Sequence, residues 1–261
     1  MIRVVWLCGA WLAAQPVAMP ATLQPKTVEA FDQYIRATEA RLERQVRGEG
    51  NFLWVDESPA RRDQVRRGEA VVAPWTGNGE VHVPGGLIHD WIGAVFIPRA
   101  TLQQALALVQ DYDNHRKVYQ PEVIGSKTLS REDNHFRVYL RLLKKKVITA
   151  VLSTEHDVIY FPLDARRCHS RSHSTRIAEV INRGEPGERE LPPGNDHGFL
   201  WRLYSYWRFE ERDGGVYVEC QAISLTRSVP TGFGWLIEPI IRQLPRESLA
   251  NTLRATRAAV K

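Results

Sequence analysis

The sequence predicts an α+β protein in which a curved antiparallel sheet of about seven strands wraps around a long C-terminal helix, with an extra helix at the N-terminus. Residues 199–227 carry the clearest signal, because two long alternating segments are joined at Asp213-Gly214-Gly215, a sequence typical of a tight hairpin. The main part of the chain reads as a strand, two helices, six strands and a closing helix. Strands and helices that are grouped in this way are typical of the α+β class.

The first 21 residues have the layout of a secretory signal peptide. Arg3 gives a short basic start, residues 4–14 form an apolar run, and small residues and prolines follow. The apolar run is too short to cross a bilayer as a helix, and an N-terminal anchor that is retained is the alternative. We therefore expect an exported protein, periplasmic or secreted, that is cleaved after Ala18 or Ala21.

The composition is that of an ordinary globular protein, with 43% hydrophobic and 25% charged residues in a chain of 261. Removal of Arg3 with the first 21 residues lowers the formal net charge from +5 to +4, and acidic residues are interspersed with the basic ones. Nucleic acid is therefore not an expected partner, because it needs a denser basic surface. Cys168 and Cys220 are expected on strands about 9–10 Å apart, which predicts free buried thiols.

Residues 22–86 are predicted to form a helix and an extension that packs on the main domain. Apolar residues recur near helical spacing within residues 26–48, at Val28, Phe31, Ile35 and Leu42. Gly48 ends this pattern. Residues 51–88 contain short apolar pieces separated by arginine, glycine and proline, which we interpret as edge strands and loops.

The main domain is predicted to span residues 87–261. A buried strand at residues 91–98 ends in proline, and Thr101 is a suitable N-cap for the helix that follows it. A second short helical segment stops at Tyr119, before Pro121. Six strands then follow, at residues 122–130, 135–144, 147–160, 166–180, 199–211 and 216–227.

The strand at residues 199–211 separates aromatic from charged side chains. One parity holds Phe199, Trp201, Leu203, Trp207 and Phe209, and the other holds Arg202, Tyr204, Tyr206, Arg208 and Glu210. Successive side chains of a strand point to opposite faces, so one face of the sheet is rich in large apolar rings. Such a face either packs against a helix or lines an apolar pocket.

The chain is predicted to end in helical segments at residues 232–243 and 245–259, separated at Pro245. The last segment is the only long apolar helix that can cover the concave face of the sheet. Because a twisted sheet diverges from a straight helix, we expect a cavity between them, lined by the aromatic face.

Local sequences support this arrangement. Asp111-Tyr112 closes the first helix of the main domain, Tyr119-Gln120-Pro121-Glu122-Val123 enters the next strand, and PRESLANTLRATRAAV closes the chain. These passages resemble the START-like, or SRPBCC, superfamily, which includes polyketide cyclases and lipid-transfer domains. The resemblance covers residues 87–261. It implies a helix-grip fold with an internal cavity for apolar or amphipathic molecules such as lipids, sterols or polyketides.

The sequence contains no G-x-S-x-G, H-E-x-x-H, Walker loop or C-x-x-C motif. His169 and His173 are four residues apart in a predicted strand, hence about 13 Å apart, which is too far to share a metal ion. With Arg171 they predict an exposed basic row, and transient contact with an anionic membrane surface is the alternative. No cofactor, metal site or catalytic residue is therefore predicted.

Arg176 shares parity with a row of small residues, Cys168, Ser170, Ser172 and Ser174. If this row faces the cavity, Arg176 lies at the cavity wall, where it can bind a ligand carboxylate or phosphate with two hydrogen bonds. The alternative is an ion pair within the protein, with Glu179 or Glu219 as the partner.

The predicted function is the binding, and transport, of a hydrophobic or amphipathic small molecule in the internal cavity. The residues expected to bind this ligand are Trp201, Trp207, Phe209, Arg176, Phe233, Trp235, Ile237 and Tyr112. Residues 231–238, with glycines around Phe233, are expected to form a gate.

Two other function classes stay open. The first is a cyclase or hydrolase working in the same cavity, with Arg176 polarising a carbonyl group and His156 or Tyr112 moving a proton. The second is a surface interaction module that uses the helix at residues 26–48 and the basic rows.

Overall fold

The computed structural model describes residues 21–145, 149–228 and 234–260, with the backbone alone described for residues 234–243. The helices are α1 (Pro25–Val46), η1 (Trp54–Glu57), α2 (Pro59–Arg66), α3 (Leu102–Gln110), η2 (Tyr112–Asn114), α4 (His115–Val118) and α5 (Gly234–Ala259). The strands of the main sheet are β2 (Val71–Pro74), β3 (Glu80–Val83), β4 (Gly86–Pro98), β5 (Val123–Glu132), β6 (His135–Lys145), β7 (Thr149–Pro162), β8 (Arg167–Ile181), β9 (Arg189–Glu190), β11 (Arg202–Arg212) and β12 (Gly215–Arg227). A separate pair joins β1 (Ala21–Thr22) to β10 (Asn195–Asp196).

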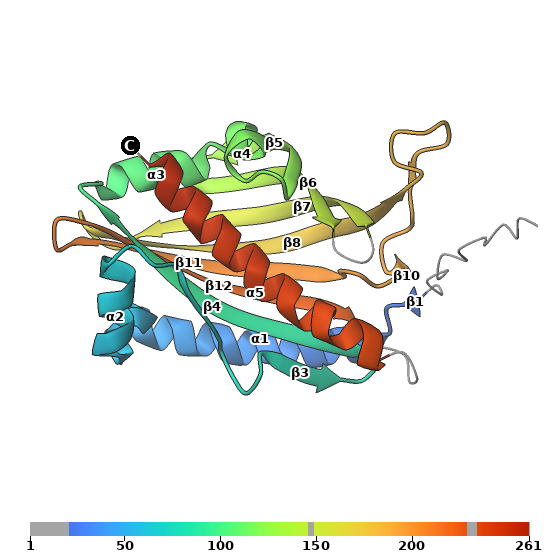
Figure 1. Cartoon of the computed structure of the whole chain (residues 1–261), viewed down its shortest axis with the longest axis horizontal. Coiled ribbons are helices and arrows are strands. Elements are labelled where there is room, and N and C mark those ends of the chain that lie inside the picture. The colour runs from blue at the N-terminus through green and yellow to red at the C-terminus, as the bar shows by residue number, and fades with distance from the viewer. Residues whose placement is uncertain (1–20, 146–148, 229–233, 261) are drawn as a thin grey trace, which may run out of the picture.

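Within the described residues the main sheet has ten antiparallel strands, and its principal order is β2-β4-β12-β11-β8-β7-β6-β5. The strands β3 and β9 pair with β4 and β8 beside this path. Figure 1 shows α5 crossing the sheet diagonally, with α1 running next to β4. This arrangement confirms the predicted helix-grip fold with an extra N-terminal helix. The sheet exceeds the expected seven strands by the short strands β2, β3 and β9.

The β11–β12 hairpin forms at the predicted place. Asp213 and Gly214 have φ angles of 56° and 76°, and Arg212 pairs directly with Gly215 across the turn. Two successive residues in the left-handed region give the turn type that matches the twist of the flanking strands. The hairpin therefore fixes which residues of β11 and β12 lie opposite each other.

We call the side of the sheet toward α5 the inner face. Leu249 and Leu253 of α5 belong to its core, together with Phe209 and Val218 of the hairpin. The helix comes close to β4 at Gly93, where a Cβ atom would lie 2.7 Å from Leu253 Cδ1. A glycine here is therefore what allows α5 to rest on β4.

The opposite, outer face is covered by the N-terminal segment. Phe31 and Ile35 of α1 lie in one buried cluster with Ile88 of β4 and Ile223 of β12. A neighbouring cluster joins residues 52–55 and α2 to the outer side of β4 and β12. The sheet is consequently covered on both faces over much of its area.

Two predictions about the helices are wrong. The segments expected to be separated at Pro245 form one continuous helix, α5. A proline loses one hydrogen bond of the helical ladder but keeps a φ angle that a helix can use. Part of the region expected as edge strands is η1 followed by α2, because Ser58 caps α2 by accepting a hydrogen bond from the Arg61 N–H and Pro59 occupies the first turn.

The six predicted strands after residue 121 are all present, with ends shifted by at most three residues. The predicted free thiols of Cys168 and Cys220 are also confirmed, since both are buried and unpaired on the strands that flank β11. Among the described helices, none combines the length and the apolar character that a membrane span requires.

Candidate functional site

The middle of the inner face carries small side chains whose surface remains accessible. Ser172 of β8 lies opposite Ser205 of β11, which in turn lies opposite Ala222 of β12. All three residues are only partly buried, although each strand has hydrogen-bonded neighbours on both sides. Ala222 packs against the core beneath α5, so the accessible surface of this row faces α5. We call Ser172, Ser205 and Ala222 the small-residue row.

Larger apolar side chains flank the small-residue row. Leu203 and Trp207 lie on the same side of β11, two residues before and after Ser205, and both keep part of their surface accessible. The Trp207 ring is parallel to that of Phe209, with centroids 6.0 Å apart. Because α5 packs mainly on β4 and β12, the inner face of β8 and β11 is left more open. We call this part of the inner face, around the small-residue row, the chamber; neither of the two pockets found on the described residues includes it.

A neutral histidine lies on the same face, one strand further along. His156 Nε2 is 3.0 Å from Thr154 Oγ1, and the Thr154 hydroxyl donates to the Leu140 carbonyl at 3.1 Å. Since this hydroxyl has only one hydrogen, His156 Nε2 must be the donor in their contact. Burial lowers the pKa of His156 to about 4, so at neutral pH its Nδ1 is an acceptor. No described group hydrogen-bonds to that nitrogen.

Three more buried polar atoms of the inner face have no partner among the described residues: Ser170 Oγ, Trp91 Nε1 and His89 Nδ1. Trp91 lies opposite Ala222, and His89 contacts Thr226 Oγ1 through Nε2 at 3.2 Å. Burial lowers the pKa of His89 to about 4, which keeps the ring neutral. The middle of the inner face is therefore polar in places but uncharged.

Tyr112 lies in the interior, and its hydroxyl already has a partner. Its Oη is 2.8 Å from Tyr160 Oη, and its ring contacts Phe136 with centroids 5.5 Å apart. Burial raises the pKa of both tyrosines, so neither is a ready proton donor at neutral pH. Trp207 and Phe209 point to the interior as expected, although Phe209 is fully buried.

The expectation that Trp201 points into the interior is wrong. Trp201 precedes β11, and it lies in the outer cluster with Phe31 and Leu225. Its indole N–H donates to Asp196 Oδ1 at 3.0 Å. The alternation that was applied to Trp201 holds only within a strand, and the chain changes direction before Arg202.

Arg176 does not share a face with Ser174, as the alternation predicted. Ser174 pairs with His156, whereas Arg176 pairs with Glu155, the residue next to His156, so Thr175 is an extra residue in β8. This β-bulge reverses the alternation and turns Arg176 to the outer face. Its guanidinium forms an ion pair with Glu190, a different carboxylate from the two considered above.

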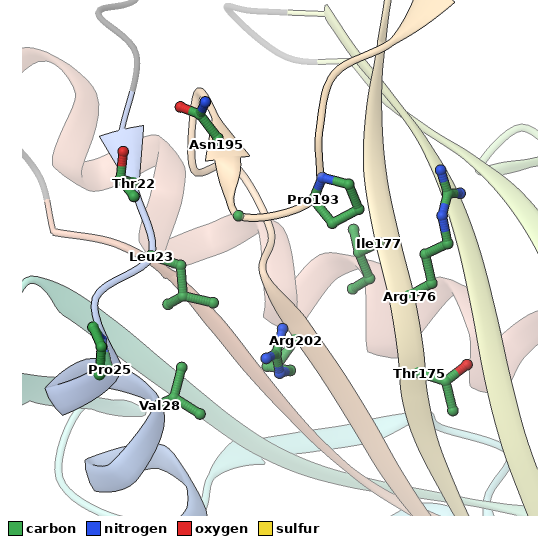
Figure 2. A pocket seen from close by; sticks show the side chains of 11 residues that line it. Thr22, Leu23, Pro25, Val28, Thr175, Arg176, Ile177, Pro193, Asn195 and Arg202 are labelled. Atoms are coloured by element: carbon green, nitrogen blue, oxygen red, sulfur yellow. The ribbon is translucent and has the colours of Figure 1, made fainter.

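Arg176 does line an open pocket outside the chamber, of about 610 Å³, next to the start of α1 (Figure 2). Leu23 and Val28 contribute apolar surface, and Arg202 lies between them and Ile177. The Arg202 guanidinium donates to the Trp201 carbonyl at 2.8 Å. The two arginines of this pocket belong to the outer face, whereas the small-residue row lies on the inner face.

The three remaining residues of the predicted ligand set are not placed. Phe233 lies outside the described residues, and the side chains of Trp235 and Ile237 do as well. The gate expected at residues 231–238 falls in the same region and stays a prediction.

The predicted exposed basic row on β8 is partly covered. His173 Nε2 lies 2.8 Å from Glu39 Oε1 of α1, and its ring is stacked on Tyr204. His169 is stacked on Phe161, and Arg171 also approaches Glu39. The N-terminal helix, which the alternation of the strand cannot reveal, accounts for this difference. Within the described residues there is no cluster of His, Cys, Asp and Glu that could hold a metal ion.

Comparison with family models gives no match, and comparison with curated proteins gives none. Similar solved structures include a STAR-related lipid transfer protein from Xanthomonas axonopodis, at 18% identity and a TM-score of 0.48 over 73% of this chain and 98% of that one. The Zhui aromatase/cyclase from Streptomyces sp. R1128 has 14% identity and a TM-score of 0.43 over 66% and 93%. A START superfamily protein from Mycobacterium smegmatis has 12% identity and a TM-score of 0.42 over 66% and 97%. The structural neighbours are thus START-type proteins and aromatase/cyclases.

Proposed function

We propose that the protein binds a hydrophobic or amphipathic small molecule in the chamber and transports it. The observation that carries this proposal is the accessible surface of Ser172, Ser205 and Ala222 at the middle of the sheet. The centre of a sheet covered by a helix is ordinarily filled by large side chains at close-packed density. Two serines and an alanine leave volume at this place, and a ligand would fill it.

The surroundings of the row suit an apolar ligand with few polar groups. Trp207 and Leu203 offer apolar surface to the same space. Removal of apolar surface from water contributes roughly 25 cal/mol per Å², so a ligand of ordinary size gains enough free energy to bind there. One or two hydroxyl groups of the row would then set its orientation.

The proposal can be tested by filling the chamber. Ser205→Leu adds a branched side chain at the centre of the row, while Ser130→Leu adds the same side chain at an exposed position of β5. We expect Ser205→Leu to weaken the binding of the uncharged probe Nile red at least tenfold and Ser130→Leu to leave it unchanged. Equal affinity of all three proteins for the probe, with each variant folded by circular dichroism, would contradict the proposal.

The enzyme considered above does not gain support from the geometry. The residues considered for catalysis were Arg176 with His156 or Tyr112. Arg176 lies on the outer face, whereas His156 and Tyr112 lie on the inner face. The backbone of the sheet lies between Arg176 and the other two residues. Binding without a reaction is therefore the function that we propose.

Export of the protein is a second part of the proposal, and it rests on the sequence of residues 1–21. Expression of the full chain in a bacterial host followed by mass measurement of the purified protein tests it. We expect a mass that corresponds to cleavage after Ala18 or Ala21, and an intact N-terminus would contradict export by this route.

A further inference from the structure

The described lining of the chamber contains hydroxyl groups and apolar groups but no charged side chain. The charged residues whose positions on β6, β8 and β11 share the inner face are Lys144, Glu179 and Glu211. Glu179 pairs with His197 at 2.8 Å, and Glu211 accepts a hydrogen bond from the Leu102 N–H at 2.6 Å. Lys144 pairs with Glu122 and Ser248. Arg131 of β5 shares this face as well, and its guanidinium lies 4.7 Å from the centre of the Phe136 ring and donates to the Asp133 carbonyl. All four charges are thus engaged with other groups of the protein.

The polar groups that do face the chamber are neutral hydroxyls. Ser172 and Ser205 lie directly opposite each other, so their Cβ atoms are about 5 Å apart. Both residues keep accessible surface, and neither hydroxyl hydrogen-bonds to a group within the described residues. A serine hydroxyl can donate to a carbonyl oxygen and can accept from another hydroxyl. The pair is therefore suited to one oxygen-containing group of a ligand.

We propose that the chamber selects uncharged ligands, whose hydroxyl or carbonyl oxygen meets Ser172 and Ser205, over the matching carboxylates and phosphates. This inference rests on the proposed function, since it concerns the ligand of the same chamber. An anion placed at the row would give up its hydration, and no described cation of the inner face is available to replace it.

The buried histidine acts in the same direction. His156 Nδ1 is an unpartnered acceptor, because its Nε2 donates to Thr154 and burial keeps the imidazole neutral. A lone pair of this kind attracts a hydroxyl hydrogen and repels a carboxylate oxygen. Arg176 and Arg202, which could neutralise an anion, lie on the other face of the sheet, next to the open outer pocket.

Three pyrene-labelled probes of one chain length test the inference: an alkane, a primary alcohol and a carboxylic acid, measured at pH 8.5 so that the acid is ionised. We expect the alcohol to bind at least tenfold tighter than the carboxylate. Ser172→Ala with Ser205→Ala should remove the advantage of the alcohol over the alkane, about fivefold for each hydrogen bond, and leave the affinity for the alkane unchanged. Ser130→Ala on the exposed part of β5 is the matched control.

The outcomes separate the two proposals. A carboxylate that binds as tightly as the alcohol, or a double variant that keeps the full preference for the alcohol, overturns the inference while the proposed function stands. If the alkane and the alcohol both fail to bind the folded wild-type protein, the proposed function fails and the inference fails with it.

Discussion

Arg208 and Glu219 form a buried ion pair on adjacent strands of the outer face, with Arg208 Nη1 3.2 Å from Glu219 Oε1. The same guanidinium donates to the Phe52 carbonyl at 2.8 Å, and Glu219 Oε2 accepts from the Trp54 N–H at 2.7 Å. Loss of water on burial raises the pKa of Glu219 to about 7, and the nearby arginine opposes this rise. The pair therefore ties residues 52–54 to the sheet.

Replacement of Glu219 by Gln should strongly destabilise the protein. It leaves the buried Arg208 without a countercharge, which costs about 3–5 kcal/mol in comparable pairs. Urea denaturation measures the loss. The control is Glu43→Gln, which breaks the exposed pair with Arg47 and should cost less than about 1 kcal/mol. Equal effects of the two substitutions would show that the buried pair does not hold the N-terminal segment.

A chain that starts at residue 87 should not fold cooperatively. Without residues 22–86, the outer face would expose Tyr217, Ile223 and Leu225, all of which are fully buried in the whole protein. Asp90 would also lose its hydrogen bond from the Tyr34 hydroxyl at 2.8 Å. Thermal unfolding followed by near-ultraviolet circular dichroism tests this expectation. A sharp transition near that of the full chain would instead make residues 87–261 an independent domain.

Stability should fall as the pH is lowered from 6.5 to 4. The pKa of both His89 and His156 is lowered by burial from 6.5 to about 4. Over this interval the unfolded chain takes up protons that the folded protein does not, so the free energy of unfolding decreases by about 3 kcal/mol for each ring. Burial also lowers the pKa of His115 and His169 to about 4, so these two rings add to the loss of stability. The Asp90 and Glu219 carboxyls work in the opposite sense, since burial raises their pKa to about 6 and about 7, but they are outnumbered by the four histidines.

Equilibrium unfolding at several pH values measures this dependence, and His156→Asn should reduce its slope. His82→Asn is the control, because His82 is exposed on β3. The comparison uses the slopes rather than the absolute stabilities, since either substitution can change the latter. Identical slopes for wild type and His156→Asn would mean that this ring is not held neutral.

Gly93→Ala should push α5 away from β4. The new methyl group would meet Leu253 Cδ1 at 2.7 Å and Val72 Cγ2 at 2.8 Å. Overpacking of this kind costs about 1–3 kcal/mol, and a shift of α5 would change how the helix covers the chamber. We expect a lower denaturation midpoint and an altered affinity for Nile red. For comparison, Gly184→Ala enters open space and bears only the cost of a left-handed backbone, about 1 kcal/mol. A wild-type affinity for the probe in Gly93→Ala would show that the chamber is independent of the α5–β4 contact.

Much of the fold could be predicted from the alternation of side chains and the turn sequences. The turn at Asp213-Gly214 fixes the register of the hairpin, which places Ser205 opposite Ala222. This register contains two of the three residues of the small-residue row, and Ser172, already noted on β8, is the third. The sequence did not identify the row as a site, because small residues on a strand are compatible with close packing of a helix.

The wrong predictions of side-chain position have local causes that the identity of a single residue does not reveal. Nothing in Ser174-Thr175-Arg176 marks Thr175 as the extra residue of a bulge, yet it moves Arg176 to the other face. Alternation assigned Arg208 to the charged side of β11 and gave no sign that this residue is buried beneath the N-terminal segment. Alternation along a strand shows which residues share a face, and it does not show which other part of the chain covers that face.

The covering of the outer face by α1 has a consequence for the order of folding. Arg41 of α1 donates to Gln221 of β12 at 2.7 Å, across 180 residues of chain. The contacts of α1 with the sheet are therefore complete only when the β11–β12 hairpin has emerged. Contacts between residues so far apart in the sequence form slowly, so the nascent chain cannot complete its fold until β12 has been synthesised. A chain that must be threaded through a membrane before it folds would benefit from this delay.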